Sequence, residues 1–200
     1  MRPLRTPGPR PLAGAAALFA ALALPAAALA ASFPGTSGPD HLVGTADSDT
    51  MTGLAGADLI EGLAGPDWID GGADSDTTYG GAGRDHIRGG TGSDKIRGGA
   101  NGDAIAGGDG GDWLSGGTGP DAILGGAGPD TIHGGDGPDT IGGGTGRDLV
   151  YGGYGNDVIR TGGDQTADAV RCGPGWDIAY LGRYDIADAS CERVVRTLEP

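Results

Sequence analysis

The chain has 200 residues, of which 45 are Gly, and only 37 % are hydrophobic and 5 % aromatic. This composition is too poor in apolar side chains for an ordinary globular core, and the lack of a three-residue glycine period excludes a collagen triple helix. The formal charge of −14, from 27 acidic and 13 basic residues, argues against a nucleic-acid partner and against anionic membrane surfaces.

Residues 1–30 have the features of a secretory signal peptide. A basic segment with three Arg precedes an apolar run over residues 12–24, and the Ala-Leu-Ala at 28–30 fits the small-residue rule for cleavage after Ala30. The alternative is a membrane anchor, but the apolar run is short for a span. We therefore expect a secreted protein, extracellular or associated with the cell surface, with no membrane span after cleavage.

A repeat of nine residues occupies positions 35–160. Asp occurs fourteen times in succession at this spacing, at positions 40, 49, 58, 67, 76, 85, 94, 103, 112, 121, 130, 139, 148 and 157. An apolar residue follows two positions after each Asp except Asp76, where Thr78 stands. The segment 116–124, Gly-Gly-Thr-Gly-Pro-Asp-Ala-Ile-Leu, is a regular unit. Repeats in phase over this length indicate a solenoid.

Each unit is expected to form a six-residue turn and a three-residue strand. Gly permits the positive φ angles of a tight turn, and alternation along the strand directs the apolar residue inward. Two units then complete one coil, and coils stack at the roughly 4.8 Å spacing of a sheet. The expected fold is all-β, a parallel β-roll (β-solenoid) over residues 31–160.

Stacking of such coils places the repeat Asp residues in two columns, one along each edge of the roll. Carboxylates one strand spacing apart repel each other, and a divalent ion between successive turns removes the repulsion. Calcium accepts six to eight oxygen ligands in flexible geometry, whereas zinc and copper favour His or Cys. The expected calcium ligands are Asp58, Asp67, Asp76, Asp85, Asp94, Asp103, Asp112, Asp121, Asp130, Asp139, Asp148 and Asp157, with Asp40 and Asp49 as weaker candidates.

The unit resembles the Gly-Gly-x-Gly-x-Asp-x-U-x nonapeptide, with U apolar, of the RTX (repeats-in-toxin) hemolysin-type calcium-binding proteins. The resemblance covers residues 35–160 and implies that each Ca²⁺ lies between turns stacked on the same edge. Because few apolar side chains offset the ordering of so many Gly residues, we expect the metal-free chain to be largely disordered. Folding would then accompany calcium binding.

The N-terminal units depart from this pattern. Thr45, Leu54 and Leu63 replace the second Gly, and Asp47 and Asp74 replace the Gly at the fourth position. These turns could bind calcium poorly or act as a cap. They could equally be decayed repeats without a special role.

Residues 161–200 lie beyond the nine-residue phase and are expected to form a small capping segment over the last apolar layer. They contain both cysteines of the chain, Cys172 and Cys191. In an exported protein a pair of cysteines indicates a disulfide, which we expect here. A redox-active or metal-binding pair is the alternative.

The sequence contains neither His-Glu-x-x-His nor Gly-x-Ser-x-Gly, and its three His residues occupy outward positions of the repeat. We therefore expect a protein that is not an enzyme. The favoured function is that of a secreted calcium-ion-binding β-roll with a structural or adhesive extracellular role. Its partner would be a polysaccharide or protein of the cell envelope or extracellular space. The alternative is a non-catalytic remnant or accessory relative of an RTX secreted hydrolase or cytolysin.

Overall fold

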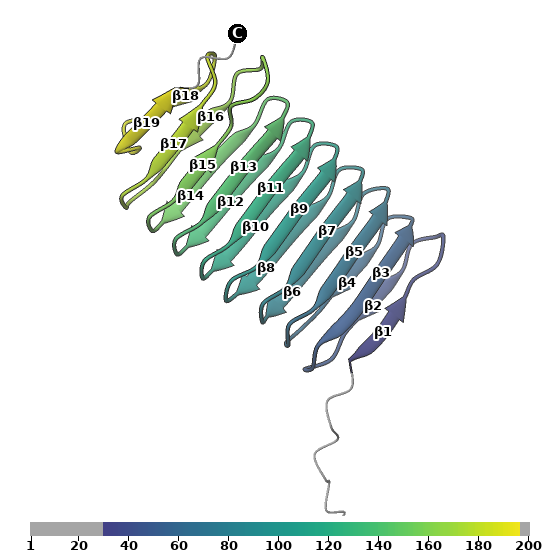
Figure 1. Cartoon of the computed structure of the whole chain (residues 1–200). Coiled ribbons are helices and arrows are strands. Elements are labelled where there is room, and N and C mark those ends of the chain that lie inside the picture. Colours follow the sequence, from purple (N-terminus) through teal and green to yellow (C-terminus); the bar gives the residue numbers. More distant parts are fainter. Residues whose placement is uncertain (1–29, 197–200) are drawn as a thin grey trace, which may run out of the picture.

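The structure, a computed structural model, describes residues 30–196, which form a flattened rod of nineteen strands (Figure 1). The expected signal peptide over residues 1–30 lies almost wholly outside the described part of the chain. Between residues 30 and 196 the structure has strands and turns but no helix, so it shows no helical segment that could span a membrane.

The strands alternate between two parallel sheets that face each other. Odd-numbered strands form a ten-stranded sheet: β1 (Ala31–Pro34), β3 (Asp49–Ala55), β5 (Trp68–Ala73), β7 (His86–Thr91), β9 (Ala104–Asp109), β11 (Ala122–Ala127), β13 (Thr140–Thr145), β15 (Val158–Arg160), β17 (Ile178–Leu181) and β19 (Arg193–Arg196). Even-numbered strands form a nine-stranded sheet: β2 (His41–Val43), β4 (Leu59–Glu61), β6 (Thr77–Ala82), β8 (Lys95–Ala100), β10 (Trp113–Thr118), β12 (Thr131–Asp136), β14 (Leu149–Tyr154), β16 (Ala169–Arg171) and β18 (Ile186–Ala187).

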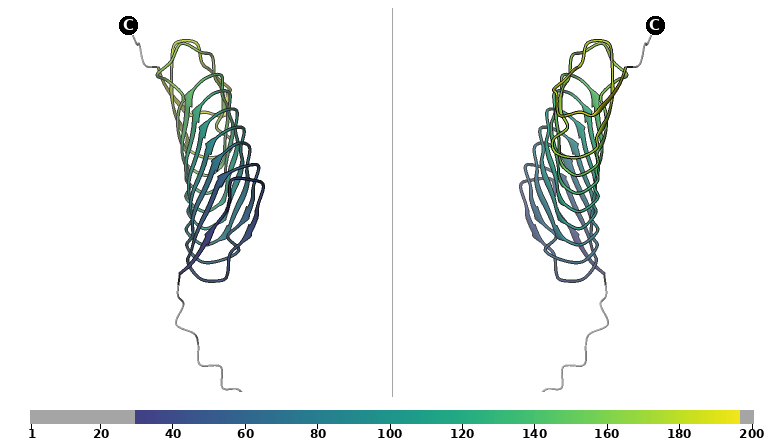
Figure 2. Two further views of the ribbon diagram at one scale, coloured as in Figure 1. Left: turned by 90° about the vertical axis from the view of Figure 1, so that its right-hand side faces the viewer. Right: turned by 90° about the vertical axis from the view of Figure 1, so that its left-hand side faces the viewer.

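Successive coils stack on one another along the rod, as the views from its two sides show (Figure 2). Trp113 pairs with Thr131, and Ala122 pairs with Thr140, so each residue pairs with its equivalent two nonapeptide units further along the chain. The coil of two units is thereby confirmed, together with the all-β parallel solenoid. This arrangement brings chemically equivalent residues of neighbouring coils next to each other.

The core is a narrow layer between the two sheets. From β3 to β15, each strand contributes one inward side chain, two residues after the repeat Asp, because neighbouring side chains of a strand point to opposite faces. These residues are almost fully buried, and Thr78 occupies the equivalent position as the one polar member within the repeats. The buried aliphatic residues of the repeats are Met51, Ile60, Ile69, Ile87, Ile96, Ile105, Leu114, Ile123, Ile132, Ile141, Val150 and Ile159.

Most strands are longer than the three residues expected from the repeat. Strand β11, for example, continues through Gly125 and Gly126 to Ala127, the first three residues of the next unit. Gly126 has a φ of 125°, yet its unit still pairs in register with the coils on both sides. Pairing persists because equivalent residues of stacked coils adopt the same conformation.

The two sheets continue beyond the nine-residue phase. Val158 pairs with Ile178, and Leu149 pairs with Ala169, so each of these steps is two residues longer than a coil of the repeat. Strands β16 to β19 thus extend the roll to residue 196. The expected disulfide between Cys172 and Cys191 is confirmed, with the two Cα atoms 5.0 Å apart.

Two Leu residues hold a backbone conformation that normally requires Gly. Leu54 and Leu63 stand at the second position of their units with φ angles of 80° and 76°, and their side chains are about half exposed. Replacing either by Gly is expected to stabilise the calcium-loaded protein by about 0.5–1 kcal/mol, since the left-handed conformation costs an L-residue more than Gly loses in flexibility.

Urea unfolding at saturating calcium measures this effect. Leu124 is similarly exposed but does not itself have a positive φ, so Leu124→Gly serves as the control. It should destabilise the protein by roughly 0.5–1 kcal/mol. A loss of stability in Leu54→Gly or Leu63→Gly would contradict the interpretation that these turns are strained.

Candidate metal centre

The repeat Asp residues form two continuous columns, one at each edge where the chain passes between the sheets. Within a column, the backbone N–H of each Asp donates to Oδ1 of the Asp one coil further on. The N–O distances along the two columns are 2.8–2.9 Å from Asp40 to Asp148 and from Asp49 to Asp157. The stacking of coils therefore fixes the position and orientation of every carboxylate.

The second carboxylate oxygen, Oδ2, has a different environment. In the described part of the chain it is buried and accepts no hydrogen bond in fourteen Asp residues. Twelve of them are the principal ligands expected from the sequence, from Asp58 to Asp157, and each of these residues is at most 3 % exposed. A buried carboxylate oxygen without a partner is energetically costly, and a cation removes that cost.

Burial is also the main cause of raised pKa values in the columns. It raises the pKa of Asp103 and Asp139 to about 7; the accepted backbone hydrogen bond lowers each value in part, and neighbouring carboxylates of the same column raise it again. Burial likewise raises the pKa to about 6 in Asp67, Asp76, Asp94, Asp121, Asp130 and Asp148. Without a cation, the folded columns therefore hold protons more tightly than the unfolded chain.

Opposite pH dependences follow for the metal-free fold and for calcium binding. Ionised columns oppose folding, so the metal-free roll is least unstable near pH 4 and is progressively destabilised as the pH rises through 6 to 7. Calcium binding requires the ionised form and should weaken as the pH falls through the same interval. Circular dichroism in calcium-free buffer should thus show more β-structure at pH 4.5 than at pH 8.

Calcium titrations at pH 5 and pH 7.5 test the second half of this prediction, and release of protons on binding at pH 6.5 is expected in an unbuffered titration. A calcium affinity that is unchanged between these pH values would contradict the assignment of the buried carboxylates as ligands.

Glycine at the first position of each unit leaves room for the carboxylate. A methyl group on Gly107 would overlap Asp112 Oδ2 and would also reach the carbonyl oxygen of Gly125 in the next coil. The same two kinds of oxygen, one carboxylate and one carbonyl, border the first Gly of the units from Gly53 to Gly134. Any side chain at this position would displace oxygen atoms from the turn.

The residues present fit calcium. The oxygen atoms that border the first Gly of the units are carboxylate and carbonyl oxygens, the ligand type that calcium prefers. Among residues 30–196, no three side chains of His, Cys, Asp or Glu converge on one point. A calcium ion here would therefore be held by one or two Asp side chains together with backbone carbonyl oxygens of the turns.

The weaker candidates Asp40 and Asp49 begin the two columns but differ from the other members. Their Oδ2 atoms accept hydrogen bonds from the backbone N–H groups of Thr36 and Thr45, at 2.6 Å in both cases. These two carboxylates already have protein partners at the atom that is unpartnered elsewhere.

Asp168 and Asp177 extend the columns and were missed by the nine-residue phase. Their Oδ1 atoms accept the N–H groups of Asp148 and Asp157, both at 2.8 Å, and their Oδ2 atoms are buried without a partner. A signal was present in the sequence, because residues 172–179, Cys-Gly-Pro-Gly-Trp-Asp-Ile-Ala, repeat the unit after a two-residue insertion. A search for the repeat that allows a change of phase would have found it.

A comparison with protein families agrees with this geometry. The profile described as "RTX calcium-binding nonapeptide repeat (4 copies)" matches five overlapping segments, residues 34–69, 52–87, 79–114, 106–141 and 133–165. Together these segments cover more than half of the 200 residues. A search among curated proteins found no match. The profile matches end before Asp168 and Asp177.

Proposed function

The chain belongs to the family of RTX calcium-binding nonapeptide repeats, and from this premise we propose that it acts outside the cell as a calcium-dependent structural and adhesive rod. Its calcium-binding β-roll is the established part; export, folding outside the cell and adhesion are the proposal. The observation that carries the proposal is the pair of columns of buried Oδ2 atoms without hydrogen-bond donors.

The columns couple metal binding to folding. Asp side chains scattered along an unfolded chain are solvated and need no cation, whereas coil stacking buries them one above another. A bound calcium ion supplies the positive charge that makes this burial favourable. Modules of this kind outside cells bind calcium typically at about 10⁻⁴–10⁻³ M, so the chain would stay unfolded at cytosolic calcium levels and fold after export.

The features of residues 1–30 support export, although they lie almost wholly outside the described residues. The three Arg residues of this segment would leave with it, which makes the charge of −14 more negative by three. About eight or nine divalent ions would balance the mature formal charge of −17. One ion for each of the fourteen Oδ2 atoms without a partner would exceed that number and reverse the sign of the net charge.

The outer face of the nine-stranded sheet supports an adhesive role. Lys95 and Arg97 on β8 lie over the ring of Trp113, at 5.7 and 5.2 Å from its centroid, and Arg171 lies over Tyr151 at 5.5 Å. None of these three cations forms an ion pair with a carboxylate among residues 30–196. They present unneutralised positive charge on one side of the rod.

Acidic polysaccharide is the partner that fits this face. Between the cations, His133 stacks on Tyr151 with ring centroids 4.6 Å apart and tilts against Trp113 at 5.8 Å. The rings cover each other, so they offer little free surface for stacking nucleic-acid bases, whereas exposed Arg and Lys can still bind carboxylates. We propose an extended, carboxylate-bearing glycan of the envelope or matrix as the partner.

Retention of the mature protein on immobilised polyuronate, with calcium and with chelator, tests this role. Retention is expected only with calcium, and the triple variant Lys95→Gln, Arg97→Gln, Arg171→Gln should bind about tenfold more weakly, since exposed charge contacts contribute roughly 0.5 kcal/mol each. The matched control removes the same charge from the other sheet at Arg88, Arg160 and Arg193. Equal loss in both variants, or retention without calcium, would refute the assigned face.

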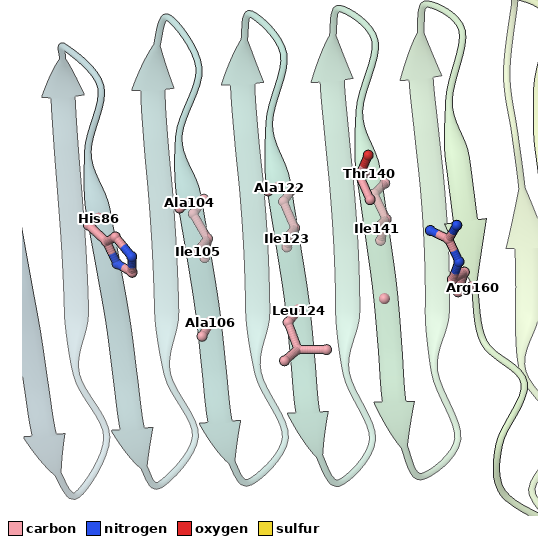
Figure 3. A pocket seen from close by; sticks show the side chains of 11 residues that line it. His86, Ala104, Ile105, Ala106, Ala122, Ile123, Leu124, Thr140, Ile141 and Arg160 are labelled. Atoms are coloured by element: carbon pink, nitrogen blue, oxygen red, sulfur yellow. The ribbon is translucent and has the colours of Figure 1, made fainter.

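We also propose that the protein is not an enzyme. The outer face of the ten-stranded sheet has a shallow hollow over β9, β11 and β13, with His86 at one end and Arg160 at the other (Figure 3). Its remaining walls are Ala, Ile, Leu, Gly and Thr, without a carboxylate or thiol that could act on a substrate. His86 stacks on Trp68 with centroids 4.3 Å apart, which gives it a packing role.

The alternative function, a non-catalytic accessory relative of an RTX secreted hydrolase or cytolysin, shares the calcium-binding roll but not the glycan-binding face. Binding of a secreted hydrolase in place of polysaccharide would favour that alternative.

A further inference from the structure

The Oδ2 atoms of the columns fall into two groups. In fourteen Asp residues, from Asp58 to Asp177, Oδ2 is buried and has no hydrogen-bond donor among the described residues. In Asp40, Asp49 and Asp185, the same atom accepts hydrogen bonds from the protein. These three residues stand at the ends of the columns, where the stack of coils begins or stops.

At the N-terminal end the donors are threonines at the second position of the unit. Thr36 donates to Asp40 Oδ2 through its backbone N–H at 2.6 Å and its hydroxyl at 3.0 Å. Thr45 donates to Asp49 Oδ2 through the same two groups at the same distances. Each of these turns is thus closed onto its own carboxylate.

The backbone conformation explains why only these turns close. From Leu54 onward, the second position of the nonapeptide units has positive φ, with Gly or one of two Leu residues there, whereas Thr36 and Thr45 do not. A β-branched residue is strongly disfavoured at positive φ. The Thr units therefore adopt another turn, in which the N–H of the second residue points at the carboxylate.

At the C-terminal end the donors come from outside the repeat. Asp185 Oδ2 accepts the N–H of Gly182 at 2.7 Å and the hydroxyl of Thr161 at 2.8 Å. Asp185 Oδ1 accepts the N–H of Asp168 at 3.2 Å and so continues the hydrogen-bond pattern of its column. This column therefore ends in a carboxylate that is fully supplied with donors.

Asp168 and Asp177 belong with the central members in spite of the irregular sequence around them. Both residues are 1 % exposed, and both have a buried Oδ2 atom without a donor. A bulge accommodates the two-residue insertion before Asp168. In this bulge the Asp164 carboxylate accepts a hydrogen bond from the N–H of Gly146 at 2.7 Å, and the Thr166 hydroxyl donates to the Gly146 carbonyl at 2.6 Å. The bulge restores the stacking of the following Asp.

From these contacts we propose that the calcium columns run from Asp58 to Asp177 and that Asp40, Asp49 and Asp185 terminate them with protein hydrogen bonds in place of an ion. The inference rests on the proposed calcium-dependent folding, and it adds which Asp residues begin and end the row of bound ions. It assigns calcium to Asp168 and Asp177, which lie outside the segments that the family profile matches. It assigns none to Asp40 and Asp49, which lie within those segments. An N–H group directed at Oδ2 occupies the position from which a cation would bind.

Counting bound calcium by equilibrium dialysis tests the boundaries. Asp168→Asn and Asp177→Asn keep the acceptor for the N–H of the preceding coil but remove the charged Oδ2, and each should bind at least one ion fewer than the wild type. The matched controls Asp40→Asn and Asp49→Asn should bind the wild-type number. Unchanged binding in the first pair, or a loss in the second pair, would overturn the inference.

A gain of binding tests the same proposal from the other end of the rod. Thr45→Gly allows positive φ at the second position and should open the turn, so that Asp49 binds at least one additional ion. This variant remains decisive if Asp177→Asn does not fold, and an unchanged ion count in it would count against the inference. A wild-type protein that binds no calcium would instead refute the proposed function. Failure of the proposed function can therefore be distinguished from failure of this inference.

Discussion

Removal of calcium by excess chelator at neutral pH is expected to convert the mature protein from a β-rich rod into a largely disordered chain. Fourteen buried carboxylate oxygens would then face no donor and no cation. Even about 1 kcal/mol for each, the low end for an unsatisfied buried polar group, would equal the roughly 5–15 kcal/mol by which whole domains are stable. We therefore expect the fold not to persist when its columns are ionised and unpaired.

Far-UV circular dichroism and small-angle X-ray scattering measure this transition together. The β-sheet signal should disappear and the radius of gyration should rise in chelator, and both should recover when millimolar calcium is added. Magnesium at the same concentration is the control and should restore little structure, because it requires a tight octahedral site and releases its water reluctantly. Full β-structure in chelator at pH 7.5 would refute the coupling of folding to metal.

Gly107→Ala, in strand β9 of a central coil, is expected to be strongly destabilising. The added methyl group would overlap Asp112 Oδ2 and the carbonyl oxygen of Gly125, so the turn must open or the carboxylate must move. We expect a loss of roughly 3 kcal/mol at saturating calcium, the upper end for an overpacked site, together with weaker calcium binding.

Gly38→Ala provides the matched control. Gly38 likewise has no positive φ, but it lies in a turn, and a Cβ atom there has no neighbour within 4 Å. Its stability should stay within about 0.5 kcal/mol of the wild type. Urea unfolding at saturating calcium compares the two variants, and equal stability would show that the first Gly of a unit is not required for space.

The irregular ends of the chain are where sequence and structure diverge most. The nine-residue phase predicted the inward aliphatic residues, the coil of two units and the alignment of Asp in columns. It stopped at residue 160, whereas the sheets extend to residue 196, first through two steps that are two residues longer than a coil of the repeat and then through two shorter ones. The bulge at Asp164 restores stacking through contacts with Gly146, a residue of the preceding coil.

The sequence by itself determined the coil, the core and the columns. Each coil of a solenoid contacts only its neighbours, so identical units adopt the same local structure. Tertiary structure alone decided which carboxylate oxygens have a donor. Thr36 and Thr45 close their turns, whereas Leu54 and Leu63 keep the open turn at positive φ. The β-branched side chain of Thr favours the closed turn, but whether Leu adopts positive φ depends on packing against the next coil, which the residue pattern does not specify.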